Sequence, residues 1–92
     1  MFKGKGNGIT EQQKQGIFLK IRPVLAERLE IGEDKITPSS KLVEELGADS
    51  LDAIEIIMDF EEMFKIEILD TEAEKMKTVE DIVVYLACRL NP

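Results

Sequence analysis

The sequence contains no histidine, no tryptophan and a single cysteine, Cys88. Without histidine, the chain cannot build a Ser-His-Asp triad or a Cys-His pair from its own residues. One cysteine supplies neither an internal disulfide nor a cysteine-based zinc site. The acidic residues also lack the alternating spacing of a calcium loop, so we expect no metal. Cys88 is expected to be a half-buried side chain on a helix of a reduced protein.

Long apolar runs are missing as well. No run approaches the roughly 20 residues that span a bilayer, and the N-terminus has lysines but no apolar signal-peptide core. We therefore expect a cytoplasmic protein.

Positive charge is scarce, with 12 lysines and arginines against 19 acids and a formal net charge of −7. Such a chain is repelled by nucleic-acid phosphates and by anionic membrane surfaces, and it suits partners with basic patches. The alternative is that the charge only keeps a small protein soluble. At 92 residues and 43% apolar content, we expect one domain over residues 10–92 behind a flexible N-terminal tail at 1–9.

The first half of the domain predicts one long helix. Thr10 and Gln13 have the spacing of a capping box. Pro23 interrupts the pattern, and we favour a kink there over a restart of the helix. We expect Gly32 to end the helix. Its apolar positions recur at helical spacing: Ile17, Ile21, Val24, Leu25 and Leu29.

The second half predicts three further helices. Residues 33–40 read as a loop and 41–46 as a short helical turn that a left-handed Gly47 stops. Asp49, with Asp52 three residues on, caps a helix to about Phe64. Thr71 begins a short helix through about Met76, and Thr78 begins the last one. The apolar positions of that last helix are Val79, Ile82, Val83, Leu86 and Leu90. No segment alternates like a strand, so we predict an all-α four-helix bundle whose third helix is short.

The helix after Asp49 has two apolar sides when residues are placed about 100° apart. A broad side suited to the core contains Ala53, Ile56, Ile57, Phe60, Met63 and Phe64. Leu51, Ile54 and Met58 lie on the opposite side. Between the two sides runs an acidic stripe of Asp52, Glu55, Asp59 and Glu62.

A helix that only packs into a bundle needs one apolar side. Leaving three large apolar side chains in water forgoes roughly 1.5–3 kcal/mol each, unless a partner covers them. The alternatives are that isolated exposed apolar residues need no function and that the acids form a solvated face. We favour a surface on which basic partners dock briefly.

Ser50, at the start of this helix, could be a nucleophile, a helix cap or an attachment point. No histidine is present to activate it, and Asp49 can provide the cap. The hydroxyl follows a glycine-containing turn, where another enzyme can reach it, and a helix N-terminus tolerates an added phosphate.

The segment from Gly47 to Asp52, which reads Gly-Ala-Asp-Ser-Leu-Asp, carries a specific resemblance. Together with Glu55, Met58, Glu61 and Glu62 it resembles the prosthetic-group site of the acyl carrier proteins of type II fatty acid synthesis. The similarity extends over roughly residues 17–90.

This resemblance implies that a phosphopantetheinyl transferase moves 4′-phosphopantetheine from coenzyme A onto Ser50. The protein would then be a monomeric, non-catalytic carrier of acyl thioesters, either for fatty acids or for a related lipid or polyketide. The partner surface that it implies consists of Asp49, Leu51, Asp52, Ile54, Glu55, Met58, Asp59, Glu61 and Glu62. The residues expected to line an acyl-chain pocket are Ile56, Phe60, Ile68 and Met76.

Two other classes of function compete with this reading. One is a helical adaptor that binds a basic partner through the same face and is never modified at Ser50. The other is an enzyme, which the lack of histidine, of a metal-ligand cluster and of a glycine-rich phosphate loop disfavours.

Overall fold

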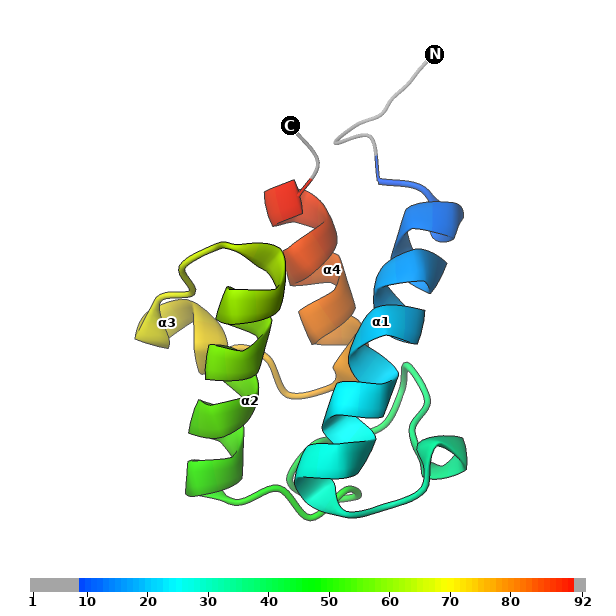
Figure 1. Ribbon diagram of the computed structural model, residues 1–92, viewed down its shortest axis with the longest axis vertical. Coiled ribbons are helices and arrows are strands. Elements are labelled where there is room, and N and C mark those ends of the chain that lie inside the picture. Colours follow the sequence, from blue (N-terminus) through cyan, green and yellow to red (C-terminus); the bar gives the residue numbers. More distant parts are fainter. Residues whose placement is uncertain (1–8, 91–92) are drawn as a thin grey trace.

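A computed structural model describes residues 9–90, which form four α-helices and one short 3-10 helix (Figure 1). The helices are α1 (Glu11–Leu29), α2 (Ser50–Phe64), α3 (Asp70–Ala73) and α4 (Val79–Leu90), and the 3-10 helix η1 spans Glu33–Lys35. Within the described residues there is no strand, only an isolated bridge between Lys41 and Thr78. The predicted all-α bundle with a short third helix is confirmed.

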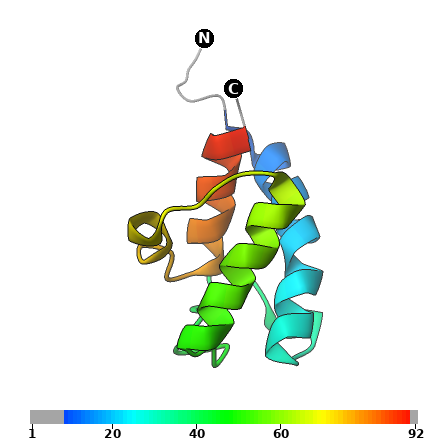
Figure 2. The same ribbon diagram turned by 60° about the vertical axis from the view of Figure 1, so that its left-hand side comes forward.

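Helix α1 packs against both α2 and α4 and runs antiparallel to them (Figures 1 and 2). The end of α1 and the start of α2 therefore lie at the same end of the bundle, away from the start of α1 and the end of α4. The tail expected at 1–9 lies outside the described residues except for Ile9, which is partly buried against the core.

Helix α1 begins as predicted. The Gln13 N–H donates to Thr10 Oγ1 at 3.0 Å, and the Thr10 N–H donates to Gln13 Oε1 at 2.9 Å. The helix continues through Pro23, so a restart there is wrong, and the kink stays a prediction. Pro23 and Leu19 are both exposed, so water can reach the Leu19 carbonyl that loses its helical donor.

The expected end of α1 at Gly32 is wrong. Glu30, with φ 58°, takes the left-handed position three residues after Glu27, and its N–H donates to the Glu27 carbonyl at 3.3 Å. Gly32 has φ −72° and precedes η1, a helical turn inside the segment predicted as a loop. A glutamate occupies the left-handed region at a cost of about 1–2 kcal/mol, which the surrounding packing must offset.

The segment before α2 is irregular but fixed to the rest of the bundle. Residues 41–46 form a single turn that does not continue into a helix. The Glu45 N–H donates to the Lys41 carbonyl at 2.9 Å, which is the bond of one helical turn, and the Leu46 N–H donates to the same carbonyl at 3.0 Å. Gly47 is left-handed as predicted, with φ 78°. The Val79 N–H donates to the Ser40 carbonyl at 3.0 Å, which ties this segment to the start of α4.

Helix α3 starts earlier than predicted, and it ends at Ala73 rather than at about Met76. Leu69 is its N-cap residue, and the Leu69 carbonyl accepts from the N–H groups of Glu72 and Ala73 at 3.0 and 2.9 Å. Thr71 is therefore inside the helix and does not cap it. The capping pair predicted for α4 is confirmed, because the Asp81 N–H donates to Thr78 Oγ1 and the Thr78 N–H donates to Asp81 Oδ2.

The core is built from α1, α2, α4 and buried side chains of the segments that connect the helices, and some residues predicted to belong to it are exposed instead. Met63 and Leu90 line a shallow hollow beside Gly16, which has no side chain to cover them. Ala53 is exposed because the predicted core side of α2 is broader than the surface that its neighbours cover. Cys88 is also exposed, contrary to expectation, on the outer side of α4. The fully buried centre consists of Ile21, Leu25, Ile36, Phe60, Val79, Ile82, Val83 and Leu86.

Candidate functional site

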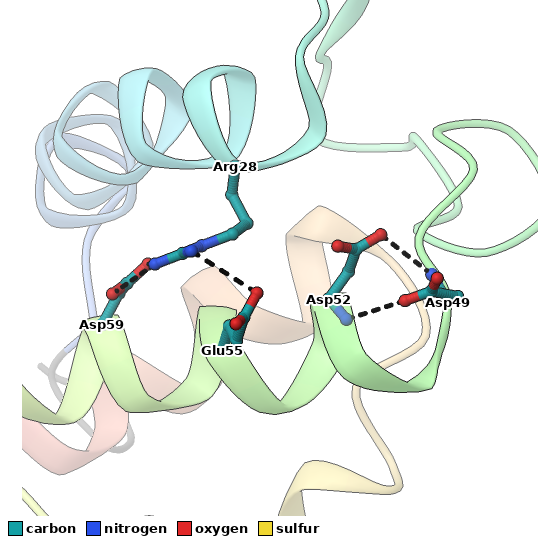
Figure 3. Close-up of polar contacts among 5 residues, drawn as sticks. All are labelled: Arg28, Asp49, Asp52, Glu55 and Asp59. Carbon is teal, nitrogen blue, oxygen red and sulfur yellow. Dashed lines mark hydrogen bonds and ion pairs between the residues drawn. The ribbon is translucent and has the colours of Figure 1, made fainter.

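Ser50 is the first residue of α2 and is exposed at the end of the bundle where α1 finishes. A capping box fixes the start of this helix. The Asp52 N–H donates to Asp49 Oδ1 at 2.8 Å, and the Asp49 N–H donates to Asp52 Oδ2 at 3.2 Å (Figure 3). The left-handed Gly47 and the buried Ala48 direct the chain into this cap. The helix start is therefore complete without the Ser50 hydroxyl.

The three serines of the chain differ in what their hydroxyls do. Ser40 is buried, and its Oγ accepts from the Thr37 N–H at 2.9 Å. Ser39 is exposed, with its Oγ 3.3 Å from Thr37 Oγ1. Ser50 Oγ makes no hydrogen bond to any residue in the described range. Of the three, Ser50 therefore offers the hydroxyl most open to reaction with another molecule.

The second apolar side of α2 faces solvent as the sequence predicted. The exposed fractions of Leu51, Ile54 and Met58 are 62%, 57% and 59%. Val43 and Leu69 are exposed to a similar degree, at 65% and 57%. The helical pattern could not reveal those two residues, because both lie in irregular segments outside α2.

An arginine of α1 occupies the middle of the acidic stripe. Arg28 Nη2 donates to Asp59 Oδ1 and Oδ2 at 3.0 and 2.8 Å, and Arg28 Nε donates to Oδ2 at 3.2 Å. Arg28 Nη1 reaches Glu55 Oε1 at 3.4 Å (Figure 3). The hydrogen bonds to Asp59 raise the pKa of Arg28, so the guanidinium stays charged. Sequence reasoning missed this residue, since the residues that it contacts are about 30 positions away.

The remaining acids of α2 also differ from one another. Glu61 Oε2 accepts from the Ile68 N–H at 2.8 Å, so this side chain holds the loop between α2 and α3. Glu62 is exposed, and its side-chain carboxylate forms no hydrogen bond or ion pair within residues 9–90. The acidic stripe therefore contains both carboxylates with internal partners and a carboxylate without one.

Comparison with known proteins adds the deciding observation. The family described as "Phosphopantetheine attachment site" matches residues 20–86, which include Ser50. Three acyl carrier proteins are also 40–48% identical to it, so the chain belongs to the acyl carrier protein family. The resemblance inferred from the segment around Ser50 is thereby confirmed, and with it a phosphopantetheine attachment site and a carrier role.

Three acyl carrier proteins illustrate how far the similarity extends. That of Akkermansia muciniphila is 48% identical over 67 residues, or 73% of this chain and 84% of the relative. That of Thermotoga maritima is 40% identical over 78 residues, 85% of this chain and 96% of the relative. That of Helicobacter hepaticus is 46% identical over 69 residues, 75% of this chain and 91% of the relative.

The geometry at Ser50 fits the prosthetic group of an acyl carrier protein. The hydroxyl is exposed and unbonded within the described chain, and it stands at the positive end of the α2 dipole, where a phosphate is favoured. Asp49 and Asp52 bring negative charge nearby, but each accepts a backbone N–H there.

The four residues predicted to line an acyl-chain pocket lie in the same buried cluster. Ile56, Phe60, Ile68 and Met76 are 2%, 0%, 6% and 8% exposed. They come from α2, from the loop before α3 and from the segment after it. The hollows lined by Gly16 and by Gly32 do not include them. A pocket at this place stays a prediction.

Two further features bear on the classes of function considered above. Among the described residues, no group of three or more histidine, cysteine, aspartate or glutamate side chains is arranged to hold a metal ion. None of the described helices is both long and apolar enough to cross a membrane.

Proposed function

We propose that Ser50 is the residue of this acyl carrier protein that receives 4′-phosphopantetheine from coenzyme A. A separate phosphopantetheinyl transferase would catalyse the transfer, since the chain has no histidine to take the hydroxyl proton. On this account the chain is a carrier and a substrate of other enzymes, and it is not itself a catalyst.

The observation that carries this proposal is the free hydroxyl of Ser50 at a helix start that Asp49 and Asp52 already cap. A serine that formed the cap itself would have its oxygen occupied by a backbone N–H. Here the Ser50 oxygen can attack the phosphorus that carries the pantetheine arm of coenzyme A and form a phosphodiester without disturbing the helix. The pyrophosphate bond breaks, adenosine 3′,5′-bisphosphate leaves, and a base of the transferase takes the hydroxyl proton. The bound group supplies a terminal thiol that holds an acyl chain as a thioester.

The residues around Ser50 would present this group to partner enzymes. Leu51, Ile54 and Met58 provide exposed apolar anchors on one side of α2. Acids beside them would meet basic patches on the transferase and on acyl-processing enzymes, speeding encounter without requiring a tight complex. We assign this role to Asp49, Asp52, Glu55, Asp59, Glu61 and Glu62.

The acyl chain would be sheltered beside α2 and α3. We assign its lining to Ile56, Phe60, Ile68 and Met76, whose apolar side chains suit a hydrocarbon. Because they fill the core without cargo, the side chains from the α3 region would have to move apart to admit it. We place this carrier in fatty acid synthesis. We expect it to act as a monomer in the cytoplasm.

Intact-mass spectrometry tests the attachment. The chain is incubated with coenzyme A and a broad-specificity transferase, alongside Ser50→Ala and the exposed control Ser39→Ala. We expect the original chain and Ser39→Ala to gain the mass of one phosphopantetheine group and Ser50→Ala to gain none. A wild-type chain that no such transferase modifies would contradict the proposal.

A further inference from the structure

We infer that Arg28 determines which acids of α2 a docking partner can use. It occupies Asp59 and competes for Glu55, so a partner's basic residues must displace it or bind elsewhere on the helix. This inference rests on the proposed function, in which α2 docks basic partners.

The geometry supports competition. Both carboxylate oxygens of Asp59 accept from Arg28, at 2.8 to 3.2 Å. The Arg28 and Asp59 side chains are 35% and 29% exposed, so an incoming cation can reach the pair but finds the carboxylate already bonded. A bidentate arginine pair is stronger and more directional than a single contact.

Glu55 is held less firmly. Only its Oε1 contacts Arg28, at 3.4 Å, and its side chain is 40% exposed. Glu55 can therefore be released to a partner at a smaller cost than Asp59. Within the stripe of Asp52, Glu55, Asp59 and Glu62, the positive charge of Arg28 offsets one of four negative charges, and it does so at the middle of the helix.

The consequence is a bias along α2. Glu62 and the second carboxylate oxygens of Asp49 and Asp52, Oδ2 and Oδ1, have no partner within the described residues and remain open to a partner enzyme. The middle of the helix, in contrast, is partly neutralised by Arg28. A partner that depends on Asp59 has to displace Arg28 first. It therefore binds more weakly than a partner that uses the acids at the two ends of α2.

Lys14 provides a matched control within the same helix. Like Arg28, it is a cation of α1 that bridges two acids, Glu80 of α4 at 3.1 Å and Glu11 at 3.3 Å. Replacing either cation with glutamine leaves 11 basic against 19 acidic residues and changes the net charge from −7 to −8. Lys14 lies near the start of α1, whereas Arg28 lies in its last turn.

The experiment measures KM and kcat of the carrier as substrate of a phosphopantetheinyl transferase at low and at physiological salt. Arg28→Gln is expected to lower KM by about two- to fivefold at low salt, as expected for release of one partly exposed ion pair. The difference in KM between Arg28→Gln and the wild type should become smaller with added salt, because exposed charges are screened. The kcat should be unchanged, since Arg28 does not contact Ser50. Lys14→Gln should leave KM within about 1.5-fold of wild type.

A double-substitution cycle separates competition from direct docking by Asp59. In Asp59→Asn, Arg28 is left with Glu55 alone, so KM should rise. Adding Arg28→Gln to Asp59→Asn should bring KM to the wild-type value or below it. A double variant whose KM stays above wild type would overturn the inference.

Other results would also overturn it. These are an unchanged or raised KM in Arg28→Gln, or an equal fall in Lys14→Gln, which would indicate net charge alone. If Arg28→Gln is poorly folded by circular dichroism, Arg28→Lys serves instead, because lysine keeps the charge but loses the bidentate contact. It should lower KM by a smaller factor, and an unchanged or raised KM would count against the inference.

A wild-type chain that is not modified at all would contradict the proposed function and this inference together. Normal modification without an Arg28 effect would contradict this inference alone.

Discussion

The side chains of Asp49 and Asp52 each accept the backbone N–H of the other residue. The Asp52 N–H donates to Asp49 Oδ1 at 2.8 Å, and the Asp49 N–H donates to Asp52 Oδ2 at 3.2 Å. The start of α2 is therefore held from both sides of Ser50. The serine between them is spared from capping although its residue type is among the commonest caps. This division of roles separates the stability of the helix from the chemistry of the hydroxyl.

The division predicts unequal stability effects at neighbouring residues. Asp49→Ala removes the acceptor for the Asp52 N–H and should lower the free energy of unfolding by about 0.5–2 kcal/mol. Ser50→Ala should change it by less than about 0.5 kcal/mol, because its oxygen has no partner within the described chain. Urea unfolding followed by circular dichroism measures both. Equal losses in the two variants would show that Ser50 takes part in the cap.

Two adjacent glutamates of α2 should also behave differently. Glu61→Ala leaves the N–H of the buried Ile68 without its acceptor and should cost about 1–3 kcal/mol of unfolding free energy. Glu62→Ala removes an exposed side chain and should stay within about 0.5 kcal/mol of the original. Urea midpoints compare the variants. A Glu61 variant as stable as the Glu62 variant would argue that water replaces the lost acceptor.

Two glycines should respond to alanine in opposite directions. At Gly47 a new Cβ meets no atom within 4 Å, but φ is 78°, so Gly47→Ala should destabilise by about 1–2 kcal/mol through backbone strain alone. Gly16 is also free of neighbours but lies inside α1, where alanine should stabilise by about 0.5–1 kcal/mol. Thermal melting reports the sign in each case. A stabilising Gly47→Ala would contradict the left-handed turn before α2.

The contact between α3 and α4 predicts a pH dependence. The Tyr85 hydroxyl donates to Glu72 Oε1 at 2.7 Å and accepts from Arg89 Nη1 at 2.6 Å. Burial and the bond to Glu72 raise the pKa of Tyr85 above its usual value of 10.0. The stabilisation is thus complete below pH 10.0 and is lost as pH rises through the raised value, because the unfolded chain releases the proton first.

Tyr85→Phe isolates this effect from other groups that titrate at high pH. The original chain should be the more stable at neutral pH, and its advantage over the variant should diminish above about pH 10. Thermal melts at several pH values measure the difference. An advantage that stays constant through this range would mean that the Tyr85 hydroxyl does not titrate with a raised pKa.

Local chemistry predicted much of this fold from the sequence. The caps at Thr10, Asp49 and Thr78 and the left-handed Gly47 depend on residues three or four positions apart. The end of α1 was missed because glycine is the usual left-handed residue, whereas packing places Glu30 there. The start of α3 was missed because a backbone carbonyl at Leu69, and not a threonine side chain, begins it.

One part of the candidate site was predictable from the sequence and another part was not. The exposed side of α2 follows from helical spacing, since it depends on one element alone. The pairing of Arg28 with Asp59 does not, because it depends on how α1 and α2 cross, which no pattern within either helix specifies. The role of Glu61 was missed for the same reason, since its partner is the backbone of a loop.

Peptide mapping of the modified protein tests the central claim most directly. After reaction with coenzyme A and a transferase, trypsin releases residues 42–65, in which Ser50 is the sole serine and no threonine or tyrosine occurs. Fragmentation mass spectrometry should place the phosphopantetheine group on this peptide, at Ser50. A group found instead on the peptide that contains Ser39 and Ser40 would contradict the account.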